Sequence, residues 1–447
     1  MNSSRQVTFL FLASAIIALM VGIFFGVIGG FQYILPLFLK ESMGFTKARP
    51  LHVTLVVTWI FSAAIGGIYY YLPKIFGKLY SIRLAYLHFI LFVITGFAII
   101  YCFFTNQFGG KEYLEFPPYL AFPMLLTWVL FMVNFFMTIK VKFLQAPIYI
   151  WMWTTGISFF FFTLLETYLW TIPFFRDNIV RDVTVQWKSM GSLVGSWNML
   201  VYGTAFYIME KISGNEIHTR SNKVFFFYFL GLTNLMFNWG HHIYIVPSAP
   251  WIGNIAYIIS MTELLILGNI IYTWKKSVNE SRQHIHLLPI RFLSSSDVWI
   301  FLNLILAILI SIPAVNAYTH GTHITVAHAM GTTIGINTMI LLASLFFIIQ
   351  QENISMSASH SFIIKKGFWV VNISLLVFWI SLIACGIIKA SEQQKGTIFQ
   401  QMMEMLSPWF HSFLIAGIGV FIGLLMICYP LFINFINNRI PKTVSES

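Results

Sequence analysis

The chain has 447 residues, of which 58% are hydrophobic and 18% aromatic, but only 9% are charged. Soluble domains carry far more charge, so this composition excludes a soluble protein and predicts a polytopic membrane protein. The net charge of +11 comes from basic residues in the connections between apolar segments rather than in one stripe, which argues against nucleic acid as a partner.

Apolar runs of about 20 residues, the length that crosses a bilayer, recur along the whole chain. We predict twelve transmembrane helices near residues 8–37, 50–73, 83–105, 119–139, 145–170, 189–209, 224–246, 251–274, 296–317, 322–350, 367–389 and 408–436. The connections are too short for a soluble domain, so we expect residues 1–447 to form one all-α transmembrane domain. We recognise no internal repeat, low-complexity tract or cleavable signal peptide.

The loop charges predict the orientation of these helices. With the loops assigned alternately to the two sides, 17 lysine and arginine residues lie on the side of both termini and 9 on the other. The positive-inside rule therefore predicts cytoplasmic termini. Cys102, Cys385 and Cys428 lie apart in predicted helices without CxxC or CxxCH spacing, so we interpret them as apolar filler and expect no attached c-type haem.

Half of the twelve histidines fall at one depth, in the non-cytoplasmic part of the predicted helices: His52, His241, His242, His320, His323 and His328. Polar residues at membrane depth are costly and usually serve chemistry, so this convergence indicates metal ligation. The other six are scattered over loops and helix ends, where we interpret them as solvated or interfacial imidazoles: His88, His218, His284, His286, His360 and His411.

Residues 313–335 read PAVNAYTHGTHITVAHAMGTTIG. His328 and Met330 are two apart and project about 200° from each other on a helix, so they can serve metals on opposite faces but not one shared metal. A core histidine beside a gap-filling methionine is the plainer interpretation. The segment resembles the metal-binding helix of the bacterial nitric oxide reductase catalytic subunit, a branch of the haem-copper oxidase superfamily. That resemblance implies that His328 ligates a high-spin haem.

The family's helix carries an H-x-H pair whose second histidine ligates a low-spin haem, and this chain has Met330 there. Residues 48–73, ARPLHVTLVVTWIFSAAIGGIYYYLP, resemble the helix with the opposite ligand, at the position of His52. Methionine is a normal axial partner of histidine and raises the haem potential. The resemblance thus implies a low-spin haem on His52 and Met330. A five-coordinate haem on His52 alone is the alternative.

Two adjacent imidazoles follow Gly240 in NWGHHIYIVPSAPWI, and packing does not easily explain them. In the resembling family this pair, His241 and His242, binds a non-haem iron with a histidine and a glutamate of the sixth helix. This chain has Asn198 and Tyr202 at those positions. They share a helix face, but Asn is a weak ligand and neutral Tyr a weaker one. The second metal is therefore iron with fewer ligands, another metal, or absent.

Several carboxylates also have possible tasks. The segment GGKEYLEFPP resembles an outer loop of the reductases, which implies a calcium ion at Glu112 near the haem propionates and a proton route beside Glu115. Glu263 falls inside a predicted helix, so we interpret it as a proton-handling residue or one that hydrogen-bonds near the binuclear site. Glu166 is as well explained by an interfacial position as by a function.

The resemblance covers the whole chain and implies a haem-copper oxidase subunit I-like fold with two haems, expected to be b-type, and a second metal. It implies a respiratory electron-transport enzyme of the bacterial inner membrane, with the haem site toward the periplasm. Such an enzyme reduces nitric oxide, a small gas, to nitrous oxide with electrons from a membrane-anchored cytochrome c-type subunit or another donor. We expect Tyr202 and Glu263 to be the catalytic residues of this enzyme. The alternatives are a nitric oxide dismutase-like enzyme and a non-catalytic haem carrier or sensor.

Overall fold

The computed structural model describes residues 2–262 and 285–438. Its long helices are α1 (Asn2–Ile34), α3 (Phe45–Phe76), α4 (Ile82–Phe104), α5 (Ala121–Thr138), α6 (Ile148–Glu166), α8 (Ile179–Ser213), α10 (Asn222–Phe237), α11 (Pro250–Thr262), α14 (Leu287–Ser311), α17 (Met339–Gln351), α18 (Ala358–Gln394) and α19 (Phe399–Asn437). The short helices are α2 (Lys40–Met43), η1 (Pro118–Leu120), η2 (Phe143–Gln145), η3 (Leu169–Thr171), α7 (Pro173–Arg176), α9 (Ile217–Arg220), η4 (Asn238–Ile243), α15 (Pro313–Thr319), α16 (His323–Met330) and η5 (Gly331–Thr338). The all-α expectation is confirmed.

Nine helical stretches in the described part of the chain are long and apolar enough to cross a membrane. The spans predicted near 189–209, 224–246 and 251–274 are not among them, so the prediction of twelve spans is not confirmed. The reason differs by helix. In α8, glycine, serine, asparagine and tyrosine residues lower the hydropathy, whereas α10 has 16 residues and the described part of α11 has 13.

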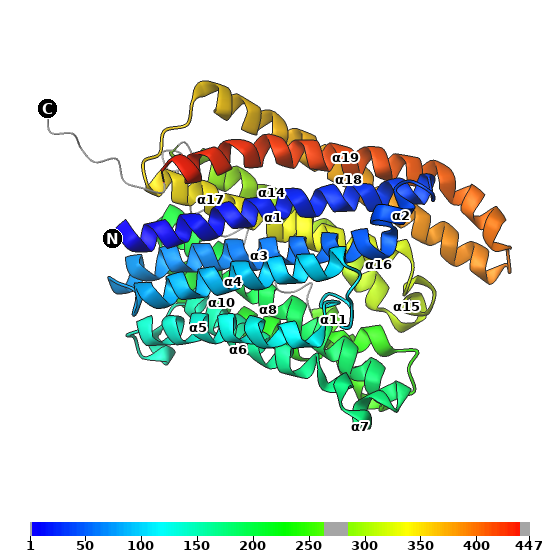
Figure 1. Ribbon diagram of the computed structural model, residues 1–447. Coiled ribbons are helices and arrows are strands. Elements are labelled where there is room, and N and C mark those ends of the chain that lie inside the picture. The colour runs from blue at the N-terminus through cyan, green and yellow to red at the C-terminus, as the bar shows by residue number, and fades with distance from the viewer. Residues whose placement is uncertain (1, 263–284, 439–447) are drawn as a thin grey trace, which may run out of the picture.

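The helices form one elongated bundle, and the start of α1 and the end of α19 lie at the same end of it (Figure 1). The short helices α2, α7 and α15 lie at the opposite end. Extensive packing joins α1 to α3 and α19, α18 to α19, and α6 to α8. The two described ends of the chain therefore lie on one side, as the loop charges predict; their cytoplasmic orientation stays a prediction.

A π-helical segment, η5, lies between α16 and α17 and widens the helix directly after Met330. Its glycines allow close packing against α14, because a Cβ on Gly335 would come within 2.9 Å of the Trp299 Cβ. π-helical segments are rare and occur frequently at functional sites. From this segment the buried Asn337 donates a hydrogen bond to Asn198 of α8 at 3.0 Å.

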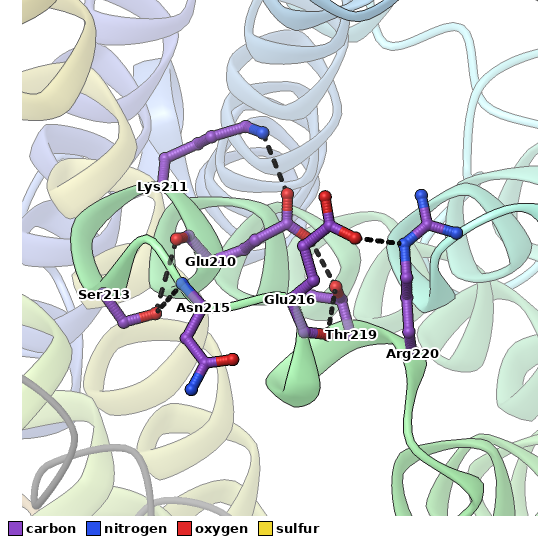
Figure 2. Close-up of polar contacts among 7 residues, drawn as sticks. All are labelled: Glu210, Lys211, Ser213, Asn215, Glu216, Thr219 and Arg220. Carbon is purple, nitrogen blue, oxygen red and sulfur yellow. Dashed lines mark hydrogen bonds and ion pairs between the residues drawn. The ribbon is translucent and has the colours of Figure 1, made fainter.

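Charged side chains close the connection from α8 to α10 at the C-terminal end of α8 (Figure 2). The Glu210 carboxylate is 5% exposed, pairs with Lys211 at 2.9 Å and accepts a hydrogen bond from Thr219. Glu216 pairs with Arg220 at 2.9 Å, and Arg220 donates to the Gln145 carbonyl. A carboxylate near a helix C-terminus is disfavoured by the helix dipole, so these donors offset a local cost.

Candidate haem and metal sites

Three of the predicted ligands, His241, His242 and His328, come together near the end of the bundle opposite the chain termini. His241 and His242 belong to η4, and their ring centroids lie 4.3 Å apart. His328 of α16 is close enough to interact electrostatically with both. Trp187 of α8, which no sequence pattern marks, stacks on His242 at 4.3 Å with an interplanar angle of 3°.

The Nδ1 atoms of the histidine pair are both occupied by other side chains. His241 Nδ1 lies 2.9 Å from the Asn238 Oδ1, an oxygen that also accepts from Ser260. An amide oxygen only accepts, so His241 Nδ1 donates. His242 Nδ1 lies 3.4 Å from the His320 Nε2. Metal-bound histidines usually donate their other ring N–H in this way, so both residues fit metal ligation through Nε2.

The other two predicted residues of the second-metal site lie on α8. The Asn198 Oδ1 is the acceptor for Asn337, so this oxygen is engaged with η5. Tyr202 is partly buried and packs against the core. Within residues 2–262 and 285–438, no three His, Cys, Asp or Glu side chains have the arrangement of a formed metal site. Metal ligation by Asn198 and a catalytic role for Tyr202 stay predictions.

His52 of α3 lies in a close-fitting recess against α1. Its Nδ1 donates to the Gly22 carbonyl at 2.8 Å. A Cβ on Gly26 would come within 2.7 Å of the same nitrogen, so only glycine lets α1 approach the ring this closely. The contact fixes the ring and leaves Nε2 for another partner. His52 therefore fits an axial haem ligand.

Met330 is partly buried and packs against a small apolar cluster contributed by α14, α16 and α18, which consists of Leu306, Ile310, Ile324, Ala327 and Leu382. The helices α3, α1, α19, α18 and α16 pack in succession between His52 and Met330. Axial ligation by Met330 stays a prediction.

His328 has a buried nitrogen without a satisfactory partner. Its Nδ1 makes no hydrogen bond of full geometry to a described residue, although the Asn303 backbone approaches it. An unpaired buried polar group costs about 1–3 kcal/mol, so native proteins seldom retain one without a purpose. A ligand role for His328 gives this imidazole a partner.

The Arg49 guanidinium lies between two carboxylates of the outer loop. It pairs with Glu112 at 2.6 Å and with Glu115. Burial raises the pKa of the Glu115 carboxyl, and the charge of Arg49 opposes that rise. Calcium prefers about six to eight oxygen ligands, and here a cation of the protein already neutralises both carboxylates. The geometry therefore does not support calcium at Glu112, which stays a prediction.

The remaining predicted residues are more peripheral. Glu166 forms an ion pair with Lys188, and both line a cavity of about 120 Å³ next to Trp239. Glu263 lies outside the described residues, so its proposed role has no structural test. The interpretation of His88 as a solvated or interfacial imidazole is wrong, because this residue is fully buried and its Nδ1 lies 3.0 Å from the Tyr69 hydroxyl.

The sequence is similar to respiratory membrane enzymes along nearly its whole length. It is 23% identical to a nitric oxide reductase subunit of Stutzerimonas stutzeri, over 95% of this chain and 93% of that protein. It is 22% identical to the cbb3-type cytochrome c oxidase subunit CcoN1 of the same organism, over 72% of this chain and 71% of that protein. Identity to cytochrome c oxidase subunit 1 of Rhodobacter capsulatus is 20%, over 95% and 84% respectively.

The fold is similar to that of a heme-copper terminal oxidase dimer solved by cryo-EM, with a TM-score of 0.74 at 12% identity. That match covers 98% of this chain and 84% of the other. The sequence pattern of Cytochrome C and Quinol oxidase polypeptide I matches residues 6–433. Members of that family bind haems and a binuclear-centre metal, and accept electrons from cytochrome c or quinol partners. The chain therefore belongs to the haem-copper oxidase subunit I family of multi-pass membrane oxidoreductases.

Proposed function

We propose that this protein reduces nitric oxide to nitrous oxide at a binuclear site near the outer end of the bundle. His328 holds a high-spin haem there, and His241 and His242 hold a second metal. The observation that carries this choice is the pair Asn198 and Tyr202 on α8. Oxidases with a covalent histidine–tyrosine pair at this spacing need a histidine at the first position, and this chain has Asn198 there.

The full-length similarity to a nitric oxide reductase subunit supports the same choice. In this proposal electrons come from a membrane-anchored cytochrome c-type subunit or another donor. His52 and Met330 would hold a low-spin haem, which would supply electron transfer. The membrane is the bacterial inner membrane, with the site toward the periplasm. When bound, the haems and second metal supply two electrons and a template for two nitric oxide molecules.

Side chains and backbone groups of this protein would orient the site and deliver protons. Asn238 and Gly22 accept ring N–H groups and thereby aim the Nε2 atoms of His241 and His52. Glu115 is partly buried at the outer loop beside Arg49, and its raised carboxyl pKa suits a group that takes up and releases protons. Two protons and two electrons convert two nitric oxide molecules to nitrous oxide and water, and Glu115 is our candidate for the outer proton route.

The test starts with haem and metal content per purified chain. Isotope-labelled nitric oxide is then supplied anaerobically with a reductant, while nitrous oxide, dinitrogen and dioxygen are followed by mass spectrometry. We expect two haems, a second metal and labelled nitrous oxide. A fully loaded protein that forms no gas with a competent donor would be a haem carrier or sensor, and the proposal would fail.

Nitric oxide dismutation is a second candidate. Asn198 and Tyr202 of α8 stand where the reductases have a histidine and a glutamate that bind the second metal, so this chain departs from the reductase pattern. The variant Asn198→His with Tyr202→Glu distinguishes the two reactions. For a weakened reductase, this variant should bind iron more tightly and form more nitrous oxide. For a dismutase, native protein should release dinitrogen and dioxygen without a donor, and the double change should suppress both products.

A further inference from the structure

His320 lies in the turn between α15 and α16, next to the histidine pair but 78 positions from His242 in the sequence. Its Nε2 faces the His242 Nδ1 at 3.4 Å, the long end of hydrogen-bond range. The Asn238 side chain serves His241 from within the same turn, η4. The orientation of His242 therefore depends on a contact between distant segments, and that of His241 on a local one.

The plane of the His242 ring is defined by its neighbours. Trp187 lies parallel to it at 4.3 Å, and the His241 ring packs at 4.3 Å with an angle of 45°. Trp187 also contacts His320 edge-on, at 5.6 Å and 65°. Stacking sets the plane of the imidazole but does not decide which ring nitrogen faces the site. A hydrogen-bond acceptor on one side makes that decision.

Hydrogen bonds and a glycine with positive φ fix the conformation of the turn that contains His320. The His320 amide donates to the Asn316 carbonyl at 2.9 Å, and the Thr322 hydroxyl donates to the Thr319 carbonyl at 2.7 Å. Gly321 has φ 75°, a conformation that favours glycine, and its carbonyl accepts from Lys389 at 3.1 Å. A turn defined in this way can hold an acceptor in one place.

We propose that His320 is a positioning residue of the second-metal site: it accepts the Nδ1–H of His242 and so directs the Nε2 of His242 toward the metal. The inference rests on the proposed second metal held by His241 and His242. It assigns His320 no bond to that metal. Partners of this kind commonly change metal affinity by about 10–100-fold when they are removed.

The test compares His320→Leu, which removes the acceptor, with His320→Gln, which retains an acceptor oxygen on a side chain of similar reach. Tyr318→Leu is the matched control, because Tyr318 is an exposed residue just before the same turn. The second site of each full-length, haem-loaded protein is emptied with a chelator and titrated with Co²⁺. Co²⁺ affinity and its visible ligand-field spectrum are the readouts, and the haem spectra report on folding.

We expect His320→Leu to weaken Co²⁺ binding by about 10–100-fold with a changed ligand-field spectrum. His320→Gln should recover most of the affinity and the native spectrum, and the control should match the native protein. Unchanged affinity and spectrum in His320→Leu would overturn the inference. Equal losses in both variants would also overturn it, because His320 would then be a ligand or a purely structural residue.

The results for the His320 variants can be distinguished from the results that test the proposed function. Native protein that holds no second metal and forms no nitrous oxide would overturn both. Native protein that holds the metal and forms nitrous oxide, together with a silent His320→Leu variant, would overturn only the role of His320.

Discussion

Single residues of α1 decide how the His52 ring is presented. The Gly22 carbonyl binds its Nδ1, and Gly26 leaves just enough room for the ring. A histidine in a membrane helix is expensive, and this recess satisfies one of its nitrogens while fixing the other. Gly22 and Gly26 therefore determine which nitrogen of the proposed haem ligand His52 is available.

We expect Gly26→Ala to displace the His52 ring, because the added Cβ would lie 2.7 Å from Nδ1. Overpacking of this kind typically costs about 1–3 kcal/mol. The low-spin haem should be lost or become high-spin, as measured by the visible spectrum and haem content per chain. Gly96→Ala is the control, because no other atom lies within 4 Å of a Cβ built there. Equal spectra for both variants would contradict the assignment of His52.

Met330 gives a second test at the residue scale. If it is the other axial ligand, Met330→His should keep a low-spin spectrum and lower the haem potential, within the roughly 0.8 V range that axial ligands span. Met330→Ala should give a five-coordinate, high-spin haem. Redox titration with optical detection measures both effects. An unchanged spectrum and potential in Met330→Ala would show that this methionine only fills space.

At the scale of elements, Arg49 joins the start of α3 to the outer loop through Glu112 and Glu115. The pairs are partly exposed, with 37% of the Arg49 side chain and 14% of that of Glu115 accessible. Their contribution therefore lies between that of a surface pair and that of a buried one. Arg49 and its two carboxylate partners also lie near His52, which is one turn further along α3.

We expect Arg49→Gln to lower stability by about 1–2 kcal/mol near neutral pH, because two carboxylates lose their cation. The Glu115 pKa should rise further, since burial would no longer be opposed. The penalty applies to the ionised carboxyl, so the difference in stability from native protein should grow as the pH rises through the Glu115 pKa and shrink as the pH falls below it. Thermal midpoints in detergent between about pH 4 and about pH 8 measure it. A difference independent of pH would contradict this account.

At the scale of the whole molecule, the described ends of the chain lie together, and the candidate sites lie toward the opposite end (Figure 1). The loop charges predict that the chain ends lie in the cytoplasm. The connection from α17 to α18 should then be cytoplasmic, and the connection from α18 to α19 periplasmic.

Single-cysteine labelling in intact cells tests this orientation. Cys102, Cys385 and Cys428 are buried, so they should contribute little background. A membrane-impermeant maleimide should label Gln394→Cys and spare Ser359→Cys, whereas both should react in permeabilised cells. Both positions are solvent-exposed at opposite ends of α18. The reverse pattern would invert the topology and place the haem site on the cytoplasmic side.

The sequence by itself determined the all-α membrane class and the haem-copper oxidase superfamily. Composition and hydropathy suffice for the class, because the bilayer demands long apolar helices. The helix count was less predictable: α8 is helical over 35 residues, but its polar content keeps it out of the nine candidate spans.

Only the tertiary structure decided what each ring nitrogen contacts. Trp187, His320 and Gly26 contact the predicted ligands from other segments. No sequence pattern marks Trp187 or Gly26, and none pairs His320 with His242. The same holds for His88, whose burial against Tyr69 depends on the packing of α3 on α4. Hydropathy and spacing report the depth and face of a residue along its own helix. Hydrogen-bond partners depend on which helices meet, and that is a property of the assembled bundle.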